Sequence, residues 1–200
     1  MIRLLFQPSE EGPDSGAKQM VEEGCMDGVD EVYGFHNTPS KPLGYCVITI
    51  FYITLLYCVI KPGITAAEAS FISIELIGKG GHGSLPQLCL DPIQAGIDFH
   101  VALKELIKKQ FEGKHKFNYS LPVFHAGVMD NIIPDTAVLQ GRLGTYDEKL
   151  TQEMRAAIRQ LLEKFKEEKR VLDYTFTILG EFPMLINTEK EAAFVHRVAE

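Results

Sequence analysis

The feature that most constrains the fold is an alternation of strand-like and helix-like apolar patterns between residues 70 and 179. Two segments with helical spacing lie among four strand-like runs, in the order strand, helix, strand, strand, helix, strand. That order predicts a ferredoxin-like (βαββαβ) layer, with two helices on one antiparallel sheet, as a separate domain over 68–180. The strands are predicted from runs rich in β-branched and aromatic residues, at 70–77, 118–126, 136–145 and 172–179.

The two helices are predicted from their first turns and their apolar faces. Asp91 can cap the first helix, with Pro92 in its first turn. Its buried stripe is expected to be Ile93, Ile97 and Val101. The second helix is expected over 148–169, and its predicted buried face consists of Leu150, Met154, Ile158, Leu161 and Phe165.

The rest of the chain predicts a second layer, of α/β type. Residues 2–6 are expected to form a short buried strand, followed by a loop and a helix over 16–23. A second apolar run covers 29–35, and 189–200 is expected to be the start of a helix that the end of the sequence cuts off. We therefore expect one domain over 1–67, to which 181–200 returns.

Composition limits which partners the protein can bind and which cellular compartment suits it. The formal net charge is −7 and acidic residues are spread along the chain, which argues against a nucleic-acid partner. Four cysteines show neither CxxC spacing nor a disulfide pattern, and the first apolar run is too short for a signal peptide. A reducing cytoplasm is the simplest compartment for this protein.

One uncharged segment, residues 43–60, raises the question of a membrane. It is about long enough to cross a thin bilayer as a helix. Its alternating Val, Ile, Thr, Tyr and Phe residues favour strands instead, so a membrane span is the less favoured alternative.

Three residues near predicted strand ends could support metal chemistry. Glu10 and Glu11 follow the first predicted strand, and His36 follows the run 29–35. Sites of α/β folds gather at the carboxyl ends of strands. One carboxylate and an imidazole could bind a divalent cation while the other carboxylate takes a proton from water. The alternatives are a solvated acidic pair at the start of a helix and an ordinary surface histidine.

Two further residues lie in turns. His82 belongs to a glycine-rich turn, 78–84, where backbone or a ligand can approach closely. The turn lacks the spacing of a phosphate loop, and an ordinary strand-to-helix turn is the alternative. Asn131, in NIIPD (131–135), is likewise a plain turn residue unless another feature gives it a role.

Six motifs follow one another in a fixed order along nearly the whole chain. They are FQPSEEG (6–12), GAKQM (16–20), GFHN (34–37), GKGGHGSLP (78–86), DPI (91–93) and AGVMDNIIPD (126–135). In order and spacing they resemble the M20 peptidase family. The branch they resemble most contains hippurate hydrolases, N-acyl-amino-acid amidohydrolases and auxin-conjugate hydrolases.

The resemblance implies a partial α/β zinc-peptidase-like catalytic domain over 1–67 and 181–200, with the ferredoxin-like layer inserted as a lid and dimerisation domain. A homodimer through the lid is therefore expected. Further metal ligands are expected before residue 1 and after residue 200, so this chain would be an internal piece of the catalytic unit.

The same resemblance implies a role for each candidate residue. Glu10 would be the general base, Glu11 and His36 would be metal ligands, and His82 and Asn131 would contact the substrate, His82 often across a dimer. The implied cofactor is a divalent metal, zinc or manganese, with two ions per subunit in the complete family site.

Two stretches depart from the family pattern. Residues 49–60 are an atypical insert, and YCVI at 45–48 recurs at 57–60, which fits a duplication or a translated non-coding insert. Many family members have GTxRT where this chain has GRLGT (141–145), so Gly144 replaces an Arg that would hold a substrate carboxylate. Arg142, on the same strand face, could compensate, with its guanidinium displaced by about 6 to 7 Å.

The sequence favours metal-dependent hydrolysis of the amide bond of small N-acyl amino acids or similar conjugates. The alternative, from a different class, is a non-catalytic dimerisation module, a pseudoenzyme that retains the lid.

Overall fold

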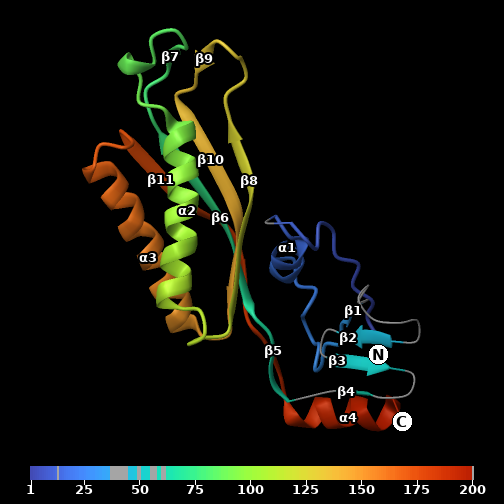
Figure 1. Cartoon of the computed structure of the whole chain (residues 1–200). Helices are drawn as coiled ribbons and strands as arrows, with labels where there is room; N and C mark the ends of the chain where they lie inside the picture. The colour runs from blue at the N-terminus through green and yellow to red at the C-terminus, as the bar shows by residue number, and fades with distance from the viewer. Residues whose placement is uncertain (13, 37–44, 49–50, 55–57, 60–61, 200) are drawn as a thin grey trace. The chain divides into compact units, whose positions relative to one another are not determined.

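The computed structural model describes residues 1–12, 14–36, 45–48, 51–54, 58–59 and 62–199 (Figure 1). They form two compact units. The terminal unit contains Met1–Ala67 and Pro183–Glu200, and the central unit contains Glu68–Phe182. The chain therefore passes between the units twice, and each unit is described by itself.

The central unit is a four-stranded antiparallel sheet with two helices on one face (Figure 1). The order across the sheet is β11-β6-β10-β8. The strands are β6 (Glu68–Ile77), β8 (Phe117–Ala126), β10 (Thr136–Thr145) and β11 (Asp173–Phe182). The helices are α2 (Pro92–Gln110) and α3 (Glu148–Glu167). The sequence predicted each of these six elements in this chain order.

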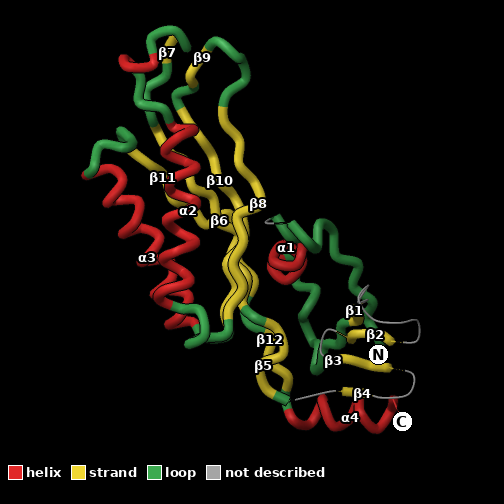
Figure 2. The backbone as a smooth tube through the Cα atoms, viewed as in Figure 1, coloured by secondary structure: helices red, strands yellow, loops and turns green. Residues whose placement is uncertain are grey.

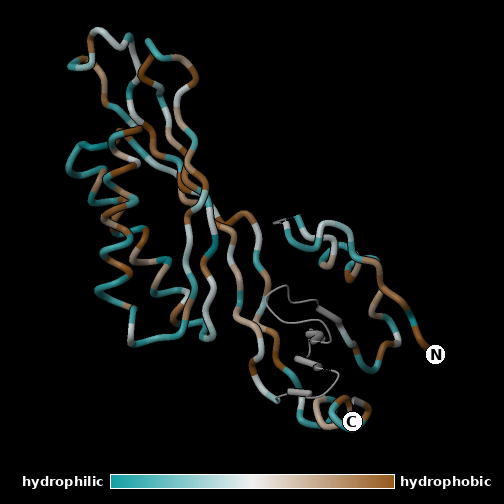
Figure 3. Tube along the Cα trace, turned by 45° about the vertical axis from the view of Figure 1, so that its right-hand side comes forward, coloured by the Kyte–Doolittle hydropathy of each residue, from teal (hydrophilic) through white to brown (hydrophobic). Residues whose placement is uncertain are grey.

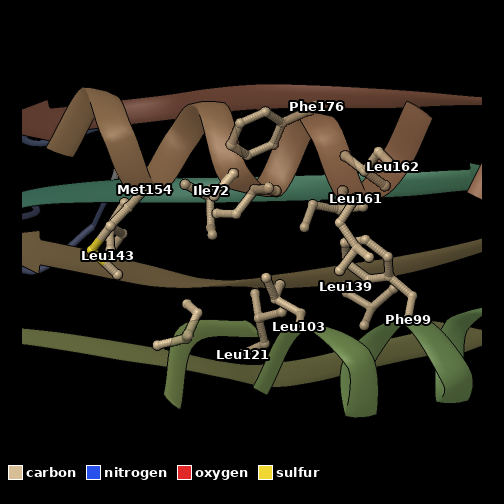
Figure 4. Close-up of a cluster of buried hydrophobic side chains, with 14 of the residues drawn as sticks. Ile72, Phe99, Leu103, Leu121, Leu139, Leu143, Met154, Leu161, Leu162 and Phe176 are labelled. Carbon is tan, nitrogen blue, oxygen red and sulfur yellow. The ribbon is translucent and has the colours of Figure 1, made fainter. Parts of the chain in front are cut away.

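The core of the central unit lies between the sheet and the two helices (Figure 4). Alternate residues of β6 face the helices, and Ile72, Ile74 and Leu76 are fully buried. The rings of Phe99 and Phe165, one from each helix, meet edge to face with centroids 5.4 Å apart. The predicted buried face of α3 is confirmed, because all five of its residues are buried. In Figure 3 hydrophobic and hydrophilic residues alternate around both helices.

The predicted buried stripe of α2 is wrong. Ile97 and Val101 are 46% and 52% exposed, whereas Phe99 and Leu103 are fully buried. The helix turns its Ala95–Gly96 face toward the sheet, where the ring of Phe124 fills the space beside Gly96. A Cβ atom on Gly96 would lie 2.7 Å from Cζ of Phe124. Both faces have apolar residues at four-residue spacing, so periodicity alone could not choose between them.

A tip at one end of the central sheet contains three short elements (Figure 2). β7 (Gly81–His82) pairs with β9 (Ile132–Ile133), and the 3-10 helix η1 (Pro86–Leu88) follows β7. The tip therefore joins the segment before α2 to the turn before β10. The long strand β6 ends beside the tip and β10 begins beside it, so these two strands set its position.

The terminal unit contains shorter elements. A helix, α1 (Gly16–Glu22), precedes a small sheet of order β1-β2-β3-β4. Its strands are β1 (Phe35–His36), β2 (Tyr45–Ile48), β3 (Phe51–Thr54) and β4 (Cys58–Val59). β5 (Gly63–Ala66) pairs with β12 (Leu185–Asn187), and α4 (Glu189–Ala199) ends the described chain.

Two strands expected in the terminal unit do not form as expected. Residues 2–6 adopt no strand, and within 29–35 only Phe35 belongs to one. The two segments, 1–6 and 28–33, flank a groove of about 800 Å³. A strand requires hydrogen bonds from a neighbouring strand, and the groove separates these two segments. Side chains of the first segment are accordingly exposed, by 90% at Ile2 and 83% at Phe6.

The described part of the segment 43–60 is made of strands, in agreement with its alternating pattern. Within the part of the chain that the structure describes, no helix has the length and apolar character needed to cross a bilayer. The expected insert 49–60 lies partly outside the described residues, at 49–50, 55–57 and 60.

Arg155 of α3 ties together the two strand ends at which the chain enters and leaves the central unit. It donates a hydrogen bond to Ser70 Oγ at 2.6 Å, pairs with Glu68 at 3.5 Å and also bonds to Glu181. The side chains of Arg155 and Glu68 are each only 14% exposed. The ion pairs therefore hold the ends of β6 and β11 against α3.

Candidate functional site

Glu10 and Glu11 lie on a loop whose two ends are joined by hydrogen bonds. The backbone N–H of Gly16 donates to the carbonyl of Pro8 at 3.0 Å. Gln7 Nε2 donates to Ser15 Oγ at 2.6 Å. Both acidic residues are exposed. The loop therefore presents two adjacent carboxylates to solvent on a short, closed segment.

Gly16 is the residue that permits this closure. A Cβ atom there would lie 2.4 Å from Cγ of Pro8 and 2.8 Å from its carbonyl oxygen. Ser15 also begins α1, since its hydroxyl accepts a hydrogen bond from the N–H of Ala17 at 3.4 Å. The pairing of motifs FQPSEEG and GAKQM thus has a physical reason, because Gly16, the first residue of the second motif, closes the loop that contains the first.

His36 is the second residue of β1, in register with Val47 of β2. Carboxylate oxygen and imidazole nitrogen are donors that zinc and manganese accept, so the chemistry of Glu11 and His36 fits either ion. Among the described residues, no three His, Cys, Asp or Glu side chains gather closely enough to hold a metal. The fit therefore rests on donor type.

The tip of the central unit brings His82 and Asn131 together, although 48 positions separate them in sequence. His82 pairs with Ile132 in the β7–β9 ladder. The next residue, Gly83, donates its N–H to the carbonyl of Asn131 at 2.8 Å. Both predicted substrate contacts thus lie on one rigid double turn.

The glycines of this tip allow close approach of backbone to backbone. A Cβ on Gly78 would lie 2.2 Å from the carbonyl oxygen of Leu90, and one on Gly80 would lie 2.4 Å from that of Ile133. Asp135 fastens the same place, because its side chain accepts the N–H of Gly80 at 2.8 Å. The run of glycines is therefore explained by packing of the turn against its neighbours.

The His82 ring is held by the turn that follows it. Nδ1 lies 2.8 Å from the hydroxyl of Ser84 and accepts the backbone N–H of the same residue at 3.2 Å. The side chain of His82 is exposed. One ring nitrogen is therefore engaged within the turn, and the ring itself faces solvent.

Arg142 lies far along the sheet from this tip. Its guanidinium stacks over the ring of Phe71 at 4.3 Å from the centroid. It is six residues along β10 from Thr136, or about 20 Å at the rise of a strand. Within the central unit, the structure therefore does not bring Arg142 beside His82 and Asn131.

Gly144, where the resemblance led us to expect an arginine, is tightly enclosed. A Cβ there would lie 2.4 Å from Oδ1 of Asn118 and 2.9 Å from the carbonyl oxygen of Glu68. The Asn118 side chain occupies the space that a longer residue would need. The packing around position 144 therefore suits a glycine and leaves no room for an arginine.

Several residues that support the site were not singled out from the sequence. Gln7, Ser15 and Gly16 close the acidic loop, and Ser84 and Asp135 fix the tip. Four of the five lie inside the motifs quoted above, and Ser15 directly precedes the motif GAKQM. Their hydrogen bonds depend on the folded conformation of each turn, and the bond from Gly80 to Asp135 also joins two segments that are far apart in the sequence.

The whole chain, residues 1–200, matches the sequence profile of Peptidase family M20/M25/M40. This chain belongs to that family. Thermostable carboxypeptidase 2 of Saccharolobus solfataricus is 36% identical over 94% of this M20 chain and 50% of its own length. Hippurate hydrolase of Campylobacter jejuni is 36% identical over 76% of the chain and 38% of its own length.

A solved structure from methicillin resistant Staphylococcus aureus, described as an aminohydrolase, has the same mixed α/β fold. It superimposes with a TM-score of 0.70 at 26% identity, over 96% of the M20 chain and 48% of the other. The chain thus spans between 38% and 50% of the length of these three relatives.

Proposed function

We propose that the complete protein is a metal-dependent amidohydrolase that cleaves the amide bond of small N-acyl amino acids or similar conjugates. The observation that carries the proposal is the family match over the whole chain, which includes both the closed Glu10–Glu11 loop and the His82–Asn131 tip. Relatives named hippurate hydrolase and N-acyl-L-amino acid amidohydrolase support this substrate class.

In this proposal Glu10 is the general base. Its carboxylate takes a proton from the attacking water and passes it to the nitrogen of the leaving amine. Glu11 and His36 would hold a divalent ion, zinc or manganese, which when bound lowers the pKa of water and polarises a carbonyl. The closed loop supports this division, because it keeps the two carboxylates adjacent while leaving both exposed.

His82 and Asn131 would bind the substrate from the tip. Arg142 would bind the substrate carboxylate. Its stacking on Phe71 uses the face of the guanidinium, whereas a carboxylate binds at the edge. At about 20 Å along β10 from the tip, Arg142 would have to contact a small substrate together with the His82 of a different subunit.

We further propose that the central unit is the ferredoxin-like lid, inserted between the two parts of the catalytic domain, and that it mediates a homodimer. The element order and the sheet order β11-β6-β10-β8 support the first part. The second is supported by the exposed apolar residues Ile97 and Val101 of α2 and by β8, which is an edge strand. We also propose a cytoplasmic location, because the four cysteines show no disulfide pattern.

The experiment that tests the catalytic proposal uses the full-length native protein with hippurate and N-acetyl amino acids as substrates. After chelation, activity should be lost and should return with zinc or manganese. Glu10→Gln should abolish turnover, whereas the control Glu22→Gln, on the exposed face of α1, should not change it.

Full activity after chelation would contradict the metal dependence. Glu10→Gln and His36→Ala variants that hydrolyse the substrates like the unchanged protein would contradict the assigned roles. If the unchanged protein hydrolyses none of these substrates but forms a stable dimer, the non-catalytic dimerisation module becomes the better description.

A further inference from the structure

The hydrogen bonds at His82 decide which of its two nitrogens carries hydrogen. The backbone N–H of Ser84 points to Nδ1 at 3.2 Å. A backbone amide can only donate, so Nδ1 must be the unprotonated acceptor. In the neutral ring the hydrogen then lies on Nε2. The Ser84 hydroxyl, 2.8 Å from Nδ1, must donate to the same atom.

The surrounding turn makes this arrangement a built feature. The N–H of Leu85 donates to the carbonyl of His82 at 2.9 Å, which closes a tight turn with Ser84 inside it. On the other side, the N–H of Gly83 donates to the carbonyl of Asn131 at 2.8 Å. The backbone of Ser84 is therefore placed beside the ring by bonds that do not involve the ring.

We propose that Ser84 is a positioning residue, which holds His82 in the Nε2–H tautomer so that the exposed ring presents a hydrogen-bond donor. This inference rests on the proposed function, because the donor would serve an amide carbonyl oxygen. Negative charge develops on that oxygen during attack, and a preorganised N–H stabilises it. The opposite tautomer would present a lone pair there, which would repel the oxygen.

The test is nuclear magnetic resonance of the protein labelled with ¹⁵N in its six histidines. Long-range ¹H–¹⁵N spectra are recorded well above the ordinary histidine pKa of about 6.5, so that the neutral rings are observed. The His82 signals are those that disappear in His82→Gln. His125, an exposed histidine with no ring hydrogen bond among the described residues, serves as the internal reference.

His82 should show one fully unprotonated Nδ1 and one protonated Nε2, whereas His125 should show averaged tautomers. Ser84→Ala keeps the backbone bond but loses the hydroxyl, and it should move the Nδ1 signal of His82 and restore part of the averaging. Thr177→Ala, which removes an exposed hydroxyl from β11 of the same unit, should leave His82 unchanged.

A protonated Nδ1, or averaging at His82 equal to that at His125, would overturn the inference. An unchanged His82 spectrum in Ser84→Ala would also remove the role of the hydroxyl. None of these spectra requires a substrate, so such a result leaves the proposed amidohydrolase activity standing.

In the full-length enzyme, Ser84→Ala should lower kcat by about tenfold with little change in KM, because the donor matters most in the transition state. A rise in KM with kcat unchanged would contradict the positioning role. Inactivity of the unchanged enzyme would instead contradict the proposed function and leave the tautomer result valid.

Discussion

The central unit and the terminal unit use their apolar side chains in opposite ways. In the central unit, strands and helices cover each other, and Phe99, Leu103 and Ile158 are fully buried. In the terminal unit, Ile2 and Phe6 point into solvent beside a groove, and the segments that contain such residues form almost no strand. A layer of helices on a sheet completes its own burial, whereas an apolar segment becomes a strand only when a partner strand is present.

Removing one phenylalanine ring from each unit is the most direct test of this difference in burial. Phe99→Ala should lower the free energy of unfolding by about 3–5 kcal/mol, because it leaves a cavity in the core. Phe6→Ala, at a side chain 83% exposed, should change it by less than about 0.5 kcal/mol. Urea unfolding followed by circular dichroism measures both. Equal losses would show that the terminal unit has a core of its own at Phe6.

The ion pairs of Arg155 allow a second comparison, between a partly buried and an exposed charge within α3. Arg155→Met should cost about 2–4 kcal/mol, because Glu68 would lose its ion-pair partner at a site where its side chain is only 14% exposed. Lys149→Met, which breaks an exposed pair with Glu153, should cost less than about 0.5 kcal/mol. The same urea experiment decides, and a small loss for Arg155→Met would mean that water reaches Glu68.

Substituting one glycine in each unit tests how closely neighbouring atoms pack against the backbone at that position. Gly78→Ala, in the tip, should destabilise by about 1–3 kcal/mol, since its Cβ would lie 2.2 Å from the carbonyl oxygen of Leu90. A Cβ atom on Gly12, in the acidic loop, would lie 3.9 Å from its nearest neighbours, so Gly12→Ala should be tolerated. Thermal unfolding of both variants is the measurement. A stable Gly78→Ala variant would show that the tip can move away from α2.

The smallest expected effect concerns a surface cluster in the terminal unit. Hydrogen bonds from Tyr33, at 2.5 Å, and Lys190, at 3.0 Å, lower the pKa of Glu31 below its ordinary value of 4.5. The same bond to Glu31 raises the pKa of Tyr33 to about 12. Because the pKa of Glu31 is lowered on folding, its stabilisation is present above the ordinary value and is lost as the pH falls through the lowered one.

Glu31→Gln should therefore be slightly less stable than the unchanged protein at neutral pH, and the difference should fade below pH 4.5. Thermal unfolding across this range measures it. A difference that grows as the pH falls would have the wrong sign for this cluster.

The central unit could be predicted from the sequence because its signals are local. The cap at Asp91 and the apolar face of α3 lie within single elements, and the structure bears them out. The stripe of α2 could not be chosen, since Ile97 and Phe99 belong to two equally apolar faces. Contact with β8 and β10 decided between them.

The candidate site divides in the same way. The sequence by itself selected the candidate residues, Glu10, Glu11, His36, His82 and Asn131, because each lies in a contiguous motif that resembles the family. Only the tertiary structure decided that Gly16 closes the acidic loop, that Asn118 fills the space beside Gly144, and that Ser84 engages Nδ1 of His82. The physical reason is that a motif records residue types along the chain, whereas close approach and hydrogen-bond direction depend on backbone conformation and packing, which exist only in the folded chain.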